Sequence, residues 1–115
     1  MKSPITTHVL DTTRGKPAVA LKVILEICTE SKEWKELARG ETDTDGRIAD
    51  LLPGDSKLPA GTYRLTFLTA PYFRSVGLEG FYPHICIVFE LKDPVSHYHV
   101  PLLLSPYGYS TYRGS

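Results

Sequence analysis

The chain has 115 residues, with 13 basic and 13 acidic side chains and a hydrophobic fraction of 42%. This size and composition are typical of one soluble globular domain, which we expect to span residues 1–115. Because the charges cancel, the composition favours neither nucleic acid nor a membrane as a partner, whereas near-zero net charge weakly favours an oligomer.

No apolar run follows residues 1–4, so we expect no secretory signal and no membrane-spanning segment. This indicates an intracellular protein. A short strand is predicted next, over residues 5–10. Over residues 18–28, apolar side chains fall at every second position, which predicts a half-buried strand.

Further strands are predicted from the same alternation or from short apolar runs bounded by turn residues. They lie over residues 34–41, just after Gly46, and over residues 62–69, 85–91, 98–104 and 107–112. Residues 71–78 predict the only helix, which opens on a proline that a first helical turn tolerates. About eight short strands with one brief helix predict an all-β fold, an antiparallel β-sandwich.

The two cysteines, Cys28 and Cys86, each fall inside an apolar stretch. Two cysteines are too few for a disulfide framework. Nothing around them creates the electropositive environment that a reactive thiol needs. Both are therefore predicted to be buried thiols.

Histidines provide the strongest chemical signal. His97 and His99 are two positions apart on one predicted strand, so both side chains are expected on the same face. Pro101 cannot donate to a ladder, so this strand is expected at a sheet edge or distorted there. Three interpretations are open: a solvated face, a three-histidine metal site completed by His8, or metal-free acid–base catalysis.

Arg47 directly follows the turn signal Asp45-Gly46. An arginine in this position is either a solvated charge or a guanidinium presented to a planar anion through paired hydrogen bonds. The local sequence alone does not decide between these roles.

The C-terminal segment, residues 107–115, is unusually rich in aromatic and hydroxyl side chains. A terminal tail is normally frayed and polar without pattern. Either this segment simply completes an edge strand, or it is tied down and lines a site through Tyr112, Arg113 and Ser115.

Three stretches resemble signatures of the transthyretin superfamily. They are residues 6–11 (TTHVLD) with 15–18 (GKPA), residues 97–111 (HYHVPLLLSPYGYST), and residues 112–115 (YRGS). The terminal tetrapeptide resembles the enzyme branch, the 5-hydroxyisourate hydrolases, whereas the hormone-carrying transthyretins lack it. The resemblance spans residues 4–115.

This resemblance implies a transthyretin-like sandwich assembled as a homotetramer, a dimer of dimers, with sites where subunits meet along a central channel. It implies hydrolysis of 5-hydroxyisourate to 2-oxo-4-hydroxy-4-carboxy-5-ureidoimidazoline, a step of urate degradation, without a metal or other cofactor. The chain shows no N-terminal extension, and its last three residues are not the peroxisomal S-K-L signal, so a cytoplasmic location is expected before a peroxisomal one.

The resemblance assigns catalysis to His8, Arg47 and His99. His99 is expected to be the base for water, His8 to orient water or substrate, and Arg47 to stabilise negative charge. The substrate-binding residues are expected to be His97, Tyr112 and Ser115. Two alternatives are a transthyretin-like carrier of a flat aromatic ligand and a three-histidine metallohydrolase.

Overall fold

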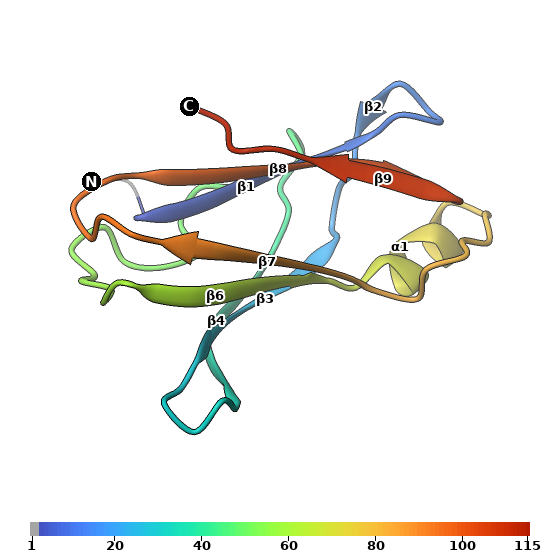
Figure 1. Cartoon of the computed structure of the whole chain (residues 1–115). Helices are drawn as coiled ribbons and strands as arrows, with labels where there is room; N and C mark the ends of the chain where they lie inside the picture. Colours follow the sequence, from blue (N-terminus) through green and yellow to red (C-terminus); the bar gives the residue numbers. More distant parts are fainter. Residues whose placement is uncertain (1–2) are drawn as a thin grey trace.

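The computed structural model describes residues 3–115 as two β-sheets packed face to face, with one short helix at one end (Figure 1). The strands of the first sheet are β1 (Ile5–Asp11), β2 (Lys16–Pro17), β5 (Arg47–Ile48), β8 (Tyr98–Ser105) and β9 (Gly108–Thr111). Their order is β2-β1-β8-β9, and β5 also pairs with β1. The second sheet contains β3 (Lys22–Cys28), β4 (Trp34–Glu41), β6 (Gly61–Phe67) and β7 (Ile85–Leu91), in the order β4-β3-β6-β7. The predicted all-β sandwich is thereby confirmed.

Alternating side chains from both sheets fill the space between them. In β6, Tyr63, Leu65 and Phe67 are fully buried, while the residues between them are partly exposed. In β8, Leu102 and Leu104 are fully buried in the same way. Burying one such apolar side chain stabilises the fold by roughly 1.5–3 kcal/mol. The alternation that predicts these strands therefore also determines which of their faces turns inward.

One strand pair differs from the antiparallel expectation. β1 and β8 are parallel, in a register that runs from Ile5 opposite Tyr98 to Asp11 opposite Leu104. All other strand pairs within residues 3–115 are antiparallel. These two strands come from opposite ends of the chain, so no hairpin turn imposes an antiparallel direction on them.

The strand predicted over residues 18–28 begins later than expected, at Lys22. Ahead of it, Ala20 has a φ of 63°, in the left-handed region that a regular strand does not use. The Ala20 N–H donates to the carbonyl of Thr42 instead of to a sheet ladder. Apolar alternation does not reveal this break, because it records burial and not backbone direction.

The helix predicted over residues 71–78 lies slightly earlier, as α1 (Thr69–Ser75). It buries Tyr72 and Phe73 against the end of the sandwich. Within residues 3–115, no helix is long and apolar enough to cross a membrane.

The prediction that both cysteines are buried is wrong. Cys28 is partly exposed and Cys86 is exposed. In β7, Cys86 lies between Ile85 and Ile87, so strand alternation turns its side chain away from the core. An apolar neighbourhood in the sequence therefore does not by itself bury a thiol.

Candidate active site

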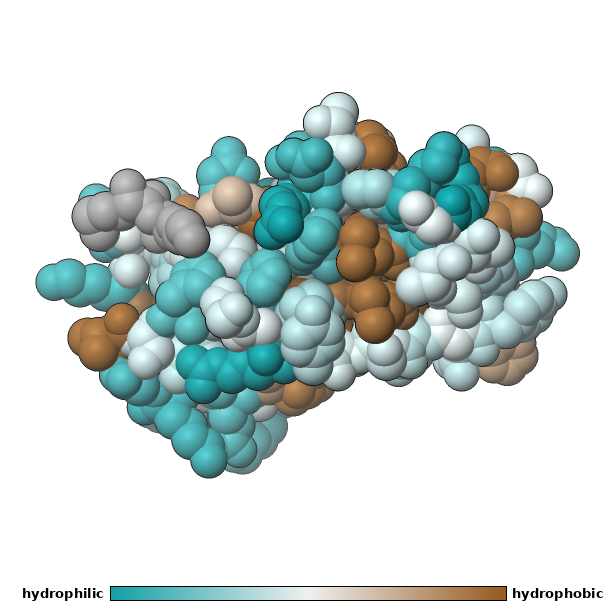
Figure 2. Space-filling view, turned by 90° about the horizontal axis from the view of Figure 1, so that it is seen from above, coloured by the Kyte–Doolittle hydropathy of each residue, from teal (hydrophilic) through white to brown (hydrophobic). Residues whose placement is uncertain are grey.

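The candidate site lies on the outer face of the first sheet, where β1 and β8 run side by side. Their parallel register places Thr6 opposite His99 and His8 opposite Pro101. The neighbouring positions Ile5, Val9 and Leu102 point into the core and are fully buried, so these four residues belong to the outward face. Figure 2 looks down onto this side of the molecule and shows mostly hydrophilic residues around a compact hydrophobic group.

The Thr6 hydroxyl lies between the two imidazoles of the predicted pair. Its oxygen is 3.0 Å from Nε2 of His97 and 2.8 Å from Nδ1 of His99. Thr6 itself is only 7% exposed, and both rings are partly buried. The two histidines therefore do lie on one face as predicted, joined by a hydroxyl group that the sequence pattern does not single out.

His8 and Arg47 are direct neighbours, because β5 pairs with β1 in a register that sets them opposite each other. Nε2 of His8 is 2.9 Å from the carbonyl oxygen of Asp45. A carbonyl oxygen only accepts, so Nε2 carries the proton and Nδ1 of the neutral ring is the acceptor.

The turn before Arg47 is closely constrained. Gly46 has a φ of 76°, and a Cβ there would lie 2.4 Å from the carbonyl oxygen of Val9 in β1. The Asp43 carboxylate accepts the backbone N–H groups of Asp45 at 2.8 Å and Arg47 at 3.0 Å. The hydrogen bond from the Arg47 N–H is the main cause that lowers the pKa of Asp43 below its ordinary value. The turn and the pairing of β5 with β1 together fix the backbone position from which the Arg47 side chain extends.

The Arg47 guanidinium takes no part in the two salt bridges found within residues 3–115. Those join Arg39 to Glu36 and Arg64 to Glu26. An arginine without a carboxylate partner keeps its paired donors available for a planar anion. This favours the anion-binding interpretation of Arg47.

The C-terminal segment is tied down beside His99. The Gly114 N–H donates to the His99 carbonyl at 2.8 Å, in the register of the β8–β9 pair, after a break opposite Pro101. A Cβ on Gly114 would lie 2.6 Å from Cδ2 of His99, so only glycine allows this approach. The structure combines the two interpretations of the C-terminal segment, because residues 108–111 complete the edge strand β9 and the residues after them are tied down beside His99.

These elements enclose a cavity of about 250 Å³ that we call the histidine pocket. It is lined by Thr6, Thr7, Arg47, Ile48, Ala49, His97, His99 and Ser115. Four of the predicted site residues, Arg47, His97, His99 and Ser115, thus meet around one cavity. His8 does not line this pocket, but it lies opposite Arg47, which does, in the pairing of β1 with β5.

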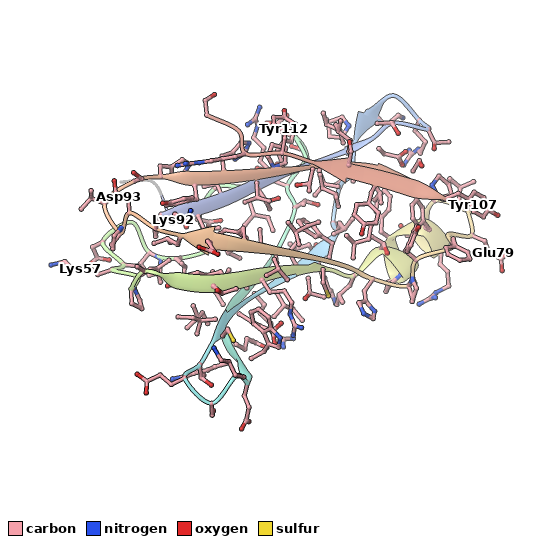
Figure 3. All side chains as sticks on the ribbon, in the orientation of Figure 1. Lys57, Glu79, Lys92, Asp93, Tyr107 and Tyr112 are labelled. Carbon is pink, nitrogen blue, oxygen red and sulfur yellow. The ribbon has the colours of Figure 1, made fainter. Side chains whose placement is uncertain are left out.

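Tyr112 lies apart from the histidine pocket in the single chain. It is 58% exposed and lines a separate cavity of about 430 Å³ between β7 and the C-terminal segment. Figure 3 places it over β8 and β9, between the end of the sandwich that holds Tyr107 and the end that holds Asp93. Within one chain, Tyr112 therefore does not contact a ligand in the histidine pocket.

The arrangement does not favour the three-histidine metal site. Nε2 of His97 and Nδ1 of His99 face the Thr6 hydroxyl, and Nε2 of His8 faces a carbonyl oxygen. Across residues 3–115, no three His, Cys, Asp or Glu side chains gather in a way that could hold a metal ion. Two imidazoles and one guanidinium around a small pocket instead suit proton transfer and stabilisation of negative charge.

Sequence reasoning missed Thr6 and Gly114 as parts of this site. Thr6 is two residues before His8, so strand alternation alone could have placed it on the same face. Nothing in the sequence shows that β1 lies beside β8, which is what brings Thr6 to His99. The role of Gly114 likewise depends on the C-terminal segment running alongside β8 as far as His99.

The chain resembles named proteins along nearly its whole length. The family described as HIUase/Transthyretin matches residues 5–114. A 5-hydroxyisourate hydrolase of Mus musculus is 46% identical over 114 residues, which cover 98% of this chain and 96% of the mouse protein. A protein of the same name from Salmonella typhimurium is 48% identical over 111 residues, covering 96% of this chain and 80% of that protein. A solved structure of sea bream transthyretin in complex with thyroxine has a TM-score of 0.90 and 32% identity, and the match covers 97% of this chain and 95% of that one.

Proposed function

The chain belongs to the HIUase/Transthyretin family, and from this premise we propose that residues 1–115 act as one domain that hydrolyses 5-hydroxyisourate. The observation that carries the proposal is the near-full-length identity to proteins named 5-hydroxyisourate hydrolase. The histidine pocket supports it, because its side chains include the acid–base and anion-stabilising groups that such a reaction needs.

The proposed substrate is a small, planar, electron-poor heterocycle, and the volume of the histidine pocket is compatible with a ligand of that size. Cavities for drug-sized ligands usually measure about 300–1,000 Å³. The histidine pocket, at about 250 Å³, is smaller and suits a compact ring. The proposed product is 2-oxo-4-hydroxy-4-carboxy-5-ureidoimidazoline, formed when water opens the six-membered ring.

The proposed chemistry adds water to a ring carbonyl. The water oxygen bonds to the carbonyl carbon while a base takes one proton, and a tetrahedral oxyanion forms. The ring C–N bond then breaks as the leaving nitrogen receives a proton. These steps require one base, one acid and a positive charge near the oxyanion, and no covalent nucleophile.

We assign His99 as the base for water, since its ring lines the pocket and is anchored by Thr6. Arg47 binds the substrate and stabilises the oxyanion, since its guanidinium lines the same pocket and is in neither salt bridge of the described chain. His8, anchored through Nε2, orients water or substrate beside Arg47 and shares proton transfer. His97 and Ser115 contact the substrate from the pocket wall.

We further propose that the protein works as a homotetramer, a dimer of dimers. Within residues 3–115, β7 pairs only with β6 and β9 only with β8, so each leaves a backbone edge without a partner strand. Val88 and Tyr112, which border the cavity between these edges, are 56% and 58% exposed. Pairing of such edges between subunits satisfies their backbone groups, and we expect it to bring Tyr112 to the substrate of a neighbouring subunit. Light scattering should report the mass of four chains.

A carrier of a flat aromatic ligand is the second candidate, favoured by the structural likeness to sea bream transthyretin in complex with thyroxine. The identity to that carrier, 32%, is lower than the 46% to the mouse hydrolase. Saturable thyroxine binding without any effect on 5-hydroxyisourate decay would place the carrier first.

The decisive assay generates 5-hydroxyisourate freshly from urate with urate oxidase and follows its ultraviolet decay. We expect the protein to accelerate the decay equally with and without a chelator. His99→Ala should lose about 10²–10⁴ in rate, the usual contribution of one acid–base group. His84→Ala is the matched control, because His84 lies outside the histidine pocket. No acceleration by the folded tetramer would reject the hydrolase proposal, and a loss under tenfold in His99→Ala would reject the assignment of the base.

A further inference from the structure

We propose that Thr6 is a positioning residue that couples the tautomers of His97 and His99 and passes a proton between them. The inference deepens the proposed hydrolase and rests on it. Thr6 forms no bond to the substrate in this scheme and acts through the two imidazoles that its hydroxyl joins.

The coupling follows from the number of protons on a hydroxyl group. Thr6 has one O–H to donate, and its oxygen accepts, yet it is within 3.0 Å of one imidazole nitrogen and 2.8 Å of another. When both rings are neutral, it can donate to only one of them. To form both hydrogen bonds while Thr6 donates one of them, the other ring must donate its own N–H to Thr6. If both rings donated to the Thr6 oxygen, the O–H of this side chain, which is only 7% exposed, would lack an acceptor, because within residues 3–115 the hydroxyl forms hydrogen bonds with only these two nitrogens.

Two arrangements satisfy this condition, and in each the two rings have the same tautomer. In the first, Nε2–H of His97 donates to Thr6, and Thr6 donates to Nδ1 of His99, so both rings are protonated on Nε2. In the second, Nδ1–H of His99 donates to Thr6, and Thr6 donates to Nε2 of His97, so both are protonated on Nδ1. Only the second makes Nε2 of His99 a base.

The bridge also gives the abstracted proton a place to go. Starting from the second arrangement, Nε2 of His99 takes a proton from the attacking water and the ring becomes an imidazolium. Its Nδ1 proton then passes to the Thr6 oxygen, while the Thr6 proton passes to Nε2 of His97. His99 is neutral again, Thr6 is unchanged, and His97 is the imidazolium. The reverse transfer returns a proton to His99 for the leaving nitrogen.

The position of His97 suits this role. Besides the histidine pocket, it lines a second, larger cavity of about 460 Å³, formed with residues such as Pro4, Gly54 and Val95. Its backbone carbonyl is held by Nη2 of Arg113 at 3.3 Å. Because the His97 ring borders both cavities, it can exchange a proton with solvent on the side away from the substrate.

The first test compares three variants in the 5-hydroxyisourate assay. Thr6→Val keeps the shape of the side chain but removes the hydroxyl, and Thr6→Ser restores it. We expect Thr6→Val to lower kcat by about tenfold or more with KM changed less than about twofold, since the interaction acts on proton transfer and not on binding. Thr6→Ser should recover most of the lost kcat.

Thr12→Val is the matched control. Its hydroxyl donates to the Leu104 carbonyl at 3.0 Å, so it also joins the end of β1 to β8, but away from the pocket. It removes an equivalent hydrogen bond and should leave kcat within about twofold of the parent, because Thr12 does not line the histidine pocket. An equal loss of kcat in Thr6→Val and Thr12→Val would mean a structural role and overturn the inference.

The second test reads the tautomers directly and does not depend on activity. Nitrogen NMR of the histidine rings in the parent protein, at a pH where both are neutral, should show His97 and His99 in the same tautomer. In Thr6→Val this correlation should disappear. One ring protonated on Nδ1 and the other on Nε2 in the parent would overturn the inference, even if Thr6→Val folds poorly.

The two proposals can fail separately. A parent protein without hydrolase activity rejects the proposed function, and the NMR result then still decides whether Thr6 couples the rings. An active parent with mixed tautomers, or with full kcat in Thr6→Val, rejects only the bridge.

Discussion

The outer faces of the two sheets both carry charged and polar side chains, but they hold them differently. On the β3–β6 face, Arg64 forms a salt bridge with Glu26 at 2.7 Å and lies 4.3 Å from the ring centre of Trp34. On the β1–β8 face, the imidazoles hydrogen-bond to neutral groups, which include the Thr6 hydroxyl and the Asp45 carbonyl.

This difference distinguishes a cluster that stabilises the fold from a cluster that is suited to catalysis. A guanidinium paired with a carboxylate has its charge neutralised locally and offers little to a ligand. An imidazole that hydrogen-bonds to a hydroxyl or a carbonyl can act as a proton donor or acceptor, because either of its ring nitrogens can carry the proton. A polar face is therefore a candidate site when neutral groups orient its ionisable side chains.

The largest difference between the two faces is expected when one arginine on each is replaced by alanine. Arg47→Ala should lower kcat/KM by about 10²–10³, the usual loss when one donor to an oxyanion is removed. Arg64→Ala, its matched control, should leave kcat/KM unchanged, because Arg64 faces away from the histidine pocket. Comparable activity losses in both variants would show that the two faces do not differ in function.

A smaller effect is expected where the tail meets the site. Gly114→Ala would push a methyl group toward Cδ2 of His99, to a distance of 2.6 Å before adjustment. Because misplacing a reacting group by about 1 Å can cost on the order of 10² in rate, we expect kcat to fall tenfold or more. The control is Gly61→Ala, where no heavy atom lies within 4 Å of the added Cβ. An unchanged kcat in Gly114→Ala would show that the ring position is not critical.

The turn that carries Arg47 should show a weaker, pH-dependent effect. Backbone hydrogen bonds from Arg47 and Asp45 lower the pKa of Asp43, so its ionised form stabilises the turn. That contribution is complete above the ordinary carboxyl pKa of about 3.9 and is lost as the pH falls through the lower folded value. Asp43→Asn should raise KM a few-fold at neutral pH.

Thermal unfolding between pH 2 and pH 6 checks the same variant. The difference in Tm between the parent and Asp43→Asn should shrink as the pH falls. Asp55→Asn, at an exposed loop carboxylate, should show no such trend. A Tm difference that grows toward low pH would contradict the assigned role of the Asp43 carboxylate.

The smallest effect is expected on the other sheet. Glu26→Gln removes the charge that pairs with Arg64, whose side chain is 25% exposed, while that of Glu26 is 17% exposed. Partly exposed pairs of this kind contribute about 1 kcal/mol or less. Urea unfolding should show a loss of that size with kcat/KM unchanged. A loss of activity would mean that this cluster is not purely structural.

Particular residues show how far sequence reasoning reaches for the site. Arg47, His97, His99 and Ser115 were predicted and do line one pocket. The placement of Tyr112 differs, since within one chain it borders another cavity. Its contact with substrate therefore depends on assembly, which a single chain's pattern does not describe. Cys86 was mispredicted because the outer side of an edge strand tolerates an exposed thiol.

Sequence patterns alone were sufficient to predict most of the strands, but not β2, together with the inward face of most of them and the family to which the end motifs belong. These depend on local periodicity and on short motifs, and both can be read one segment at a time. The parallel pairing of β1 with β8, which brings Thr6 to His99 across 93 residues of chain, is visible only in the folded structure. Such pairing depends on how all strands share one core, and no local pattern encodes it.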